Sequence, residues 1–530
     1  MRLSKRWKIV LGCAGGALFA YTLVFAIGLA WVSRHGQQFI LRQIQKRFQG
    51  EVQIDSINVK VYPQFQVTGT GVVVHFDGRE DLPPLVSIQS FTAQANWLAL
   101  WRLPRHISHV TLVGLQITIP AGVRRDLNLN GHKPLHWHGV YMDDVRADDA
   151  TLTLLPKQAG KEPQVYDIAS LEAHSTSSES TMAFRATLRI PVPPGNILST
   201  GEFGPWDVNA PGQTPVSGSY TYDNADLGHF KGIAGILSSK GRYDGVIEKI
   251  VVKGTTDTPN FSVDSGDHPL DLTTVFDAIV DGANGDTTLD PVDARFRNTT
   301  LRTTGTIEGA PGRKGKTIRL QVSSTQARIE DILLLVVKNQ PALTGDVRLN
   351  TAFVLPAGSR HDVLHRLFLS GSFTVDKAVF TNHGVEQKID KLSMRSQGDT
   401  GDVPDDENVA SQMQGQFRLR DGVLTFSDLN FRVPGAQVQM VGTFGLDNQT
   451  LDLHGTFDMD AKLSQTTTGV KSFLLRAVNP FFAKPGGGTR IPFRIGGTAR
   501  SPIYSLDLHR KKSEQPQSPA TKAPDVAARN

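Results

Sequence analysis

Residues 416–433 read QFRLRDGVLTFSDLNFRV, and apolar side chains alternate with polar ones on both sides of an Asp-Gly pair. The apolar positions are Phe417 and Leu419 before the pair, and Leu429, Phe431 and Val433 after it. Successive side chains of a strand point to opposite faces, so this period of two predicts strands with one apolar and one polar face. Asp-Gly is favoured in tight hairpin turns, so the stretch predicts an antiparallel hairpin.

The same period extends over most of the chain. It recurs through residues 57–61, 115–119 and 318–322, and strand after strand up to residue 460. Helical periodicity is limited to residues 326–337 and 467–478, with a weaker candidate at 361–369. We therefore expect a mainly β protein with a few short helices. Such helices cannot cover the apolar face, so it must pack on another sheet or line a cavity, and alternation does not distinguish the two.

A membrane anchor is expected at the N-terminus. Residues 9–32 carry no charge, and the eight residues before them contain four basic residues and no acidic one. At about 1.5 Å per residue, a helix of this length crosses a hydrocarbon core of about 30 Å. The basic flank favours a cytoplasmic N-terminus, which leaves the remaining chain exported. A cleaved signal peptide is the alternative, although signal apolar regions run only about 7–15 residues.

The charge and the cysteine content argue against several classes of function. The chain has a net charge of +5, but residues 1–47 contribute +8 and residues 510–530 contribute +3, so residues 48–509 carry −6. A mildly acidic body argues against a nucleic-acid surface. The lone cysteine, Cys13, lies in the apolar run, so the exported part has neither a disulfide nor a cysteine nucleophile.

Catalytic and metal-binding motifs do not match. Five residues separate Gly309 from Gly315 where a P-loop has four, and the segment lies between two expected strands, so a basic turn is predicted. Residues 281–290 resemble a calcium loop, but Ala283 stands where Asp or Asn is needed and the terminal Glu is absent, so a turn is predicted there too. We expect no enzyme activity, no cofactor and no metal site; the histidines at 132, 136 and 138 are read as a solvated loop.

One short sequence occurs twice. Residues 254–263 read GTTDTPNFSV and residues 497–506 read GTARSPIYSL, which share the pattern G-T-x-x-[ST]-P-x-[FY]-S-[VL]. Proline cannot donate a ladder hydrogen bond, so each copy predicts a strand end, a turn and the start of the next strand. The repeat favours an internal duplication.

The chain resembles the AsmA-like family of bacterial envelope proteins, which are related in architecture to TamB and to bridge-like lipid-transfer proteins. The resemblance rests on the order of degenerate β-patterns near both ends of the chain. These are Val61-Tyr62-Pro63, Gly71–Val74, Pro84–Ile88, Trp97–Leu100 and Ile107–Leu115 near one end, and Leu419–Leu424 and Gly497-Thr498…Pro502 near the other.

The resemblance implies an elongated, twisted antiparallel sheet that is curled into an apolar groove and projects from the inner membrane into the periplasm. On this basis the chain divides into a cytoplasmic basic segment (1–8), a transmembrane anchor (9–32), an amphipathic helix (33–48), an N-terminal AsmA-like β region (49–135), a middle β-groove region (136–410), a C-terminal AsmA-like β region (411–509) and a disordered polar tail (510–530).

Members of the family are implicated in moving phospholipid toward the outer membrane, and some in outer-membrane assembly; no catalytic residue belongs to the family pattern. The expected partners are therefore phospholipid, the inner membrane and other envelope proteins. The alternative function is a periplasmic scaffold or assembly factor for outer-membrane proteins. The candidates for lining a lipid groove are Phe417, Leu419, Phe426, Leu429, Phe431, Val433, Val438, Met440, Leu451, Leu453, Phe457 and Phe493.

Overall fold

The structure is a computed structural model that describes most residues between Val52 and Asp507. The longest internal stretches outside the description are residues 120–139, 382–410 (except 393, 394 and 396) and 463–486. The expected anchor, the helices at 33–48 and 467–478, the three loop histidines and the polar tail therefore lie outside the described residues. None of the helices in the described part of the chain is long and apolar enough to cross a membrane.

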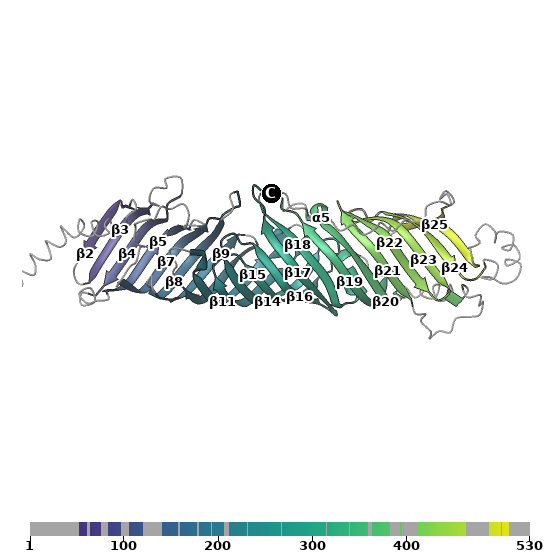
Figure 1. Cartoon of the computed structure of the whole chain (residues 1–530), viewed down its shortest axis with the longest axis horizontal. Coiled ribbons are helices and arrows are strands. Elements are labelled where there is room, and N and C mark those ends of the chain that lie inside the picture. Colours follow the sequence, from purple (N-terminus) through teal and green to yellow (C-terminus); the bar gives the residue numbers. More distant parts are fainter. Residues whose placement is uncertain are drawn as a thin grey trace, which may run out of the picture. The chain divides into compact units, whose positions relative to one another are not determined.

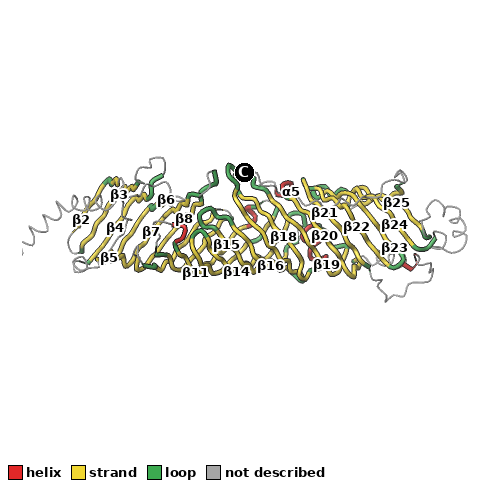
Figure 2. Tube along the Cα trace, in the orientation of Figure 1, coloured by secondary structure: helices red, strands yellow, loops and turns green. Residues whose placement is uncertain are grey.

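The chain forms two compact units. Unit 1 comprises residues 1–341 and 347–369, and unit 2 comprises residues 342–346 and 370–530. Strands dominate both, and helices are few and short (Figures 1 and 2). The mainly β fold expected from the sequence is confirmed.

Unit 1 contains most of the strands. They are β1 (Val52–Gln53), β2 (Ser56–Lys60), β3 (Phe65–Val74), β4 (Val86–Ala95), β5 (Arg105–Val113), β6 (Gln116–Ile119), β7 (Val140–Leu154), β8 (Gln164–Thr176), β9 (Met182–Pro191), β10 (Pro194–Phe203), β11 (Pro215–Asp226), β12 (Ile233–Ala234), β13 (Ile236–Val246), β14 (Lys249–Val263), β15 (Leu270–Val280), β16 (Thr287–Phe296), β17 (Thr299–Gly309) and β18 (Lys316–Gln326). Its helices are η1 (Pro211–Gln213), η2 (Leu227–His229), α4 (Ile329–Val336) and α5 (Val363–Arg366).

Strand β19 (Leu343–Leu355) is divided between the units: residues 343–346 belong to unit 2 and residues 347–355 to unit 1. Strand β20 (Phe368–Phe380) belongs to unit 2 except for residues 368 and 369, which belong to unit 1. The further strands of unit 2 are β21 (Gln412–Arg420), β22 (Val423–Val433), β23 (Ala436–Gly445), β24 (Leu451–Met459), β25 (Thr489–Thr498) and β26 (Ser501–Leu506). From β21 onward each strand pairs antiparallel with the next.

The sheet of unit 1 is antiparallel except at one step. From β7 onward each long strand pairs antiparallel with its successor, as the neighbouring strands β14 to β18 show (Figure 1). Strands β5 and β6, however, both run parallel to β7. The antiparallel sheet expected from the sequence is confirmed apart from this step, where residues 120–139 lie between β6 and β7 in the chain. A parallel pair needs such a long crossover.

The predicted hairpin turn at Asp421-Gly422, the turns at 281–286 and 310–315, and two of the predicted helices are confirmed. Asp421 and Gly422 join β21 to β22 with φ angles of 50° and 72°, the left-handed conformation that a tight hairpin turn requires. Residues 281–286 connect β15 to β16, and residues 310–315 connect β17 to β18. The helix expected at 326–337 is α4, and the weaker candidate at 361–369 is the single turn α5.

The repeated sequence behaves differently in its two copies. The second copy forms the expected turn, since β25 ends at Thr498 and β26 starts at Ser501. For the first copy the prediction is wrong: β14 continues through it to Val263. Strand β15 pairs with β14 on both sides of a bulge between Thr258 and Phe261. Pro259 lies in this bulge, where it donates no ladder hydrogen bond, so the strand does not end there.

Helix α4 is attached to the sheet through a charged residue. The Asp331 side chain is 1 % exposed, and its carboxylate accepts hydrogen bonds from Arg297 Nε, Asn298 N and Thr299 Oγ1, each at 3.0 Å. Thr299 Oγ1 also accepts a hydrogen bond from the amide of Arg328, the residue before the helix, at 3.0 Å. The turn between β16 and β17 therefore holds the N-terminal end of α4, whose N-cap residue Arg328 makes no side-chain capping hydrogen bond.

Candidate functional site

The twelve candidate residues share one face of the unit 2 sheet. Paired residues of an antiparallel ladder lie on the same face, and alternate residues of a strand do so as well. The pairs that connect them are Phe417–Phe426, Leu429–Met440, Phe431–Val438 and Val438–Phe457, while Leu453 and Phe493 pair with Gly442 and Gly455 of the same face. A bulge in β22 between Phe426 and Leu429 keeps both on this face although their separation is odd.

These side chains differ in burial. The buried ones are Leu419, Leu429, Phe431, Val433 and Leu453, and the half-buried ones are Phe417, Phe426, Val438, Met440, Leu451, Phe457 and Phe493. Phe431 and Val433 form a packed cluster with Ala436, and the ring of Phe380 meets Phe431 edge-on at a centroid distance of 5.6 Å. Part of this face is therefore occupied by the protein itself.

Glycines on the same face are covered by aromatic rings. A Cβ atom added to Gly455 would lie 2.9 Å from Cζ of Phe493, and one added to Gly415 would lie 2.8 Å from Cε1 of Phe373. Both distances are shorter than carbon contacts in proteins, so only glycine allows the rings to lie across the backbone. The rings thereby extend the apolar surface over strands that carry no side chain there.

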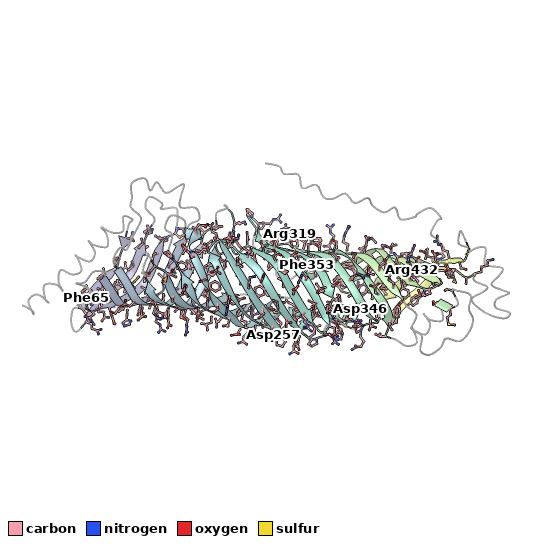
Figure 3. The ribbon with its side chains drawn as sticks, turned by 60° about the horizontal axis from the view of Figure 1, so that its bottom comes forward. Phe65, Asp257, Arg319, Asp346, Phe353 and Arg432 are labelled. Carbon is pink, nitrogen blue, oxygen red and sulfur yellow. The ribbon has the colours of Figure 1, made fainter. Side chains whose placement is uncertain are left out.

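Unit 1 has a corresponding apolar face that the sequence candidates did not include. Cross-strand pairs connect Phe276 of β15 to Val292 of β16 and Leu320 of β18 to Phe353 of β19, and all four side chains are half-buried. Phe353 lies on the face opposite to that of Arg319, and both are labelled in Figure 3. The alternation of apolar and polar residues at 318–322 indicated this apolar face. No feature of the sequence, however, distinguished these residues as candidates for binding lipid.

Hydroxyl groups interrupt the apolar face at β10–β15. Ser199 Oγ and Tyr243 Oη are 2.7 Å apart, Tyr220 Oη and Ser239 Oγ are 3.1 Å apart, and the hydroxyls of Thr256 and Thr274 are 2.6 Å apart. Burial raises the pKa of the Tyr220 and Tyr243 phenols above the ordinary value. These hydroxyl groups are satisfied by one another, so they add little polarity toward a ligand.

The opposite face of the unit 1 sheet is charged. Its cross-strand ion pairs include Lys253–Asp277 at 2.9 Å and Arg302–Asp293 at 2.8 Å. Arg302 donates two hydrogen bonds to the Asp293 carboxylate, which holds the pKa of that group below its usual range. Between these charges lie single apolar residues such as Val275, which is 61 % exposed. The sheet thus presents a hydrated face and a half-buried apolar face.

No reactive constellation is seen among the described residues, where no three His, Cys, Asp or Glu side chains are placed to hold a metal ion. The segments that resemble a P-loop and a calcium loop are both turns between strands. Comparison of the chain with protein-family models, with curated proteins and with solved structures found no match.

Proposed function

We propose that the protein is a non-enzymatic lipid carrier that is anchored in the inner membrane by residues 9–32 and holds acyl chains against the apolar face of its periplasmic sheet. In this function it supports the movement of phospholipid between the inner and outer membranes. The N-terminus lies in the cytoplasm and the β units in the periplasm.

The observation that carries the proposal is the incomplete burial of the apolar face. In unit 1 a single sheet presents Val252, Phe276, Val292, Leu320 and Phe353 half-buried, and no second sheet covers them within the described residues. Aliphatic and aromatic surface left in water costs about 25 cal/mol per Å². Acyl chains would cover this surface, and the backbone groups beneath it are already paired within the ladder.

Site-specific photocrosslinking in cells tests the proposal. A photoreactive residue at Val292, on the apolar face, should crosslink to phospholipid, which mass spectrometry of the purified full chain identifies. Val275 is the matched control, because it is an equally apolar valine on the neighbouring strand but faces outward opposite Asp293. Lipid at Val292 and none at Val275 supports the carrier. Crosslinks from Val292 only to the protein itself would refute it.

Strand β26 supports a second candidate function, a periplasmic scaffold for outer-membrane proteins. This strand pairs with β25, and all six of its residues are exposed, including Ile503 at 64 % and Tyr504 at 72 %. A strand with an open edge can accept a partner strand through backbone hydrogen bonds. Protein crosslinks from Tyr504 together with an empty apolar face would favour the scaffold over the carrier.

A further inference from the structure

The hairpins of unit 1 lie on two opposite rims of its sheet. Because consecutive strands from β7 to β18 are antiparallel, the connections alternate between the rims, and the β7–β8 connection falls on the rim opposite to that of β15–β16 and β17–β18. Six strand steps separate β8 from β15, and β15 has 11 residues. In a flat sheet these connections would lie about 45 Å apart.

They are in contact instead. The amide of Gly312 donates to the carbonyl oxygen of Gly160 at 2.8 Å, and Lys161 Nζ lies 2.8 Å from Asp286 Oδ2. Tyr166 Oη donates to the carbonyl oxygen of another rim residue, Gly282, at 2.8 Å, and the amide of Gly315 donates to Glu162 Oε2 at 3.4 Å. We call this contact the seam; it joins residues 160–166 to residues 281–286, 309–313 and 315–316.

The seam closes the sheet on its apolar side. Tyr166 pairs with Leu152 and lies on the same face as Ile168, which packs against the buried Ala147 and Ala150. Since the Tyr166 hydroxyl reaches the other rim from that face, the strands between β8 and β15 curve with their apolar face on the inside. Burial, together with the negative charge of Asp281, raises the pKa of Tyr166 to about 12, as expected for an enclosed phenol.

The contacts across the seam are polar. The side chains of Lys161 and Asp286 are 13 % and 20 % exposed. Burial disfavours the Asp286 carboxylate, but hydrogen bonds from Lys161 and from the amide of Gly309 outweigh it and leave the pKa of Asp286 below its usual range. Burial lowers the pKa of the neighbouring Lys316. Charged and amide groups can exchange such contacts for water, so the two rims can separate without exposing an apolar interface.

We propose that the seam is a separable latch over the apolar face of unit 1, and that its opening lets a phospholipid enter or leave the sheet sideways. The proposal rests on the proposed function, because only a lipid-binding face needs lateral access. In this proposal the turns that resemble a calcium loop (281–286) and a P-loop (309–313 and 315–316) hold the two rims together and bind neither calcium nor phosphate.

A reversible disulfide across the seam tests this latch in the full-length chain. A Cβ atom on Gly160 would lie 3.6 Å from Cβ of Pro311, a separation that suits a disulfide. The variant Gly160→Cys/Pro311→Cys is made with Cys13→Ser, which removes the one native cysteine. The oxidised protein should exchange a fluorescent phospholipid with acceptor vesicles at least about tenfold more slowly than the same protein after reduction. The reduced form controls for the strain of replacing Gly160, whose φ is 82°.

A lipid-independent readout separates the two hypotheses. Lys161→Met should accelerate hydrogen–deuterium exchange in residues 309–316, whereas Lys253→Met, which removes an ion pair of similar length on the outer face, should leave it unchanged. Three results would each overturn the latch. They are equal hydrogen exchange in the two lysine variants, equal lipid exchange in the oxidised and reduced forms, and failure of the disulfide to form. If neither form holds lipid, the proposed function fails, and the hydrogen-exchange comparison alone decides whether the seam separates.

Discussion

Replacing Asp331 with alanine should detach α4 from the sheet. The substitution removes the acceptor for Asn298 N and for the Thr299 hydroxyl, whose residue is 0 % exposed, and both donors are then left without the carboxylate. A buried donor left unsatisfied costs about 1–3 kcal/mol, whereas an exposed group returns to water at little cost. Arg297 is 54 % exposed and Asn298 is also exposed, so both return to water, and we expect a loss of about 1–3 kcal/mol from the Thr299 hydroxyl.

Native-state hydrogen exchange measures this loss where it occurs. Amides of α4 and of the β16–β17 turn should lose protection in Asp331→Ala, while Asp331→Asn, which keeps one carbonyl acceptor, should lose less. Asp293→Ala is the control, since that carboxylate also binds an arginine but lies on the hydrated face, where the change should be too small to resolve. Protection of α4 in Asp331→Ala equal to that in the control would refute the anchoring role of the carboxylate.

Burial and charge also set the expected effects of three other substitutions, at Phe431, Tyr166 and Asp286. Phe431→Ala should destabilise unit 2 by about 3–5 kcal/mol in denaturant unfolding, because the side chain is 6 % exposed within a packed cluster; a loss below about 1 kcal/mol would mean that the cluster is open to solvent. Tyr166→Phe should cost about 1–3 kcal/mol, because the carbonyl oxygen of the buried Gly282 loses its donor; unchanged exchange at Gly282 and its neighbours would contradict this. The pKa of Asp286 is lower in the folded protein than in the unfolded chain, so its stabilising effect is present above about pH 4 and is lost as the pH falls through the lowered value. Hydrogen exchange across the seam, corrected for its intrinsic pH dependence, should therefore accelerate on acidification in the native protein, whereas Asp286→Asn should be faster already at pH 7 and show less further change; parallel pH profiles would exclude this carboxylate as the titrating group.

Features that depend on near neighbours in the chain were predictable from the amino-acid sequence alone. Within each regular run of β21 to β25, the period of two assigned the apolar positions to one face, because alternate side chains of a strand point the same way; the bulge between Phe426 and Leu429 was not predicted. Asp421-Gly422 specified a turn because these residues tolerate positive φ, and the spacing of Ile329, Ile332 and Leu333 specified a helix. Each of these features is set within a few residues of chain.

The burial of the apolar face depends on contacts between residues far apart in the chain, which the sequence pattern does not predict. Phe431 and Phe426 both belong to β22 and both lie on the apolar face, yet Phe431 is buried in a cluster with Phe380 and Phe426 stays half-buried. The contact between Lys161 and Asp286 joins residues 125 positions apart and depends on the curvature accumulated over six strand steps. Twist between neighbouring strands varies by several degrees with bulges and packing, so a period of two carries no information about where two rims meet.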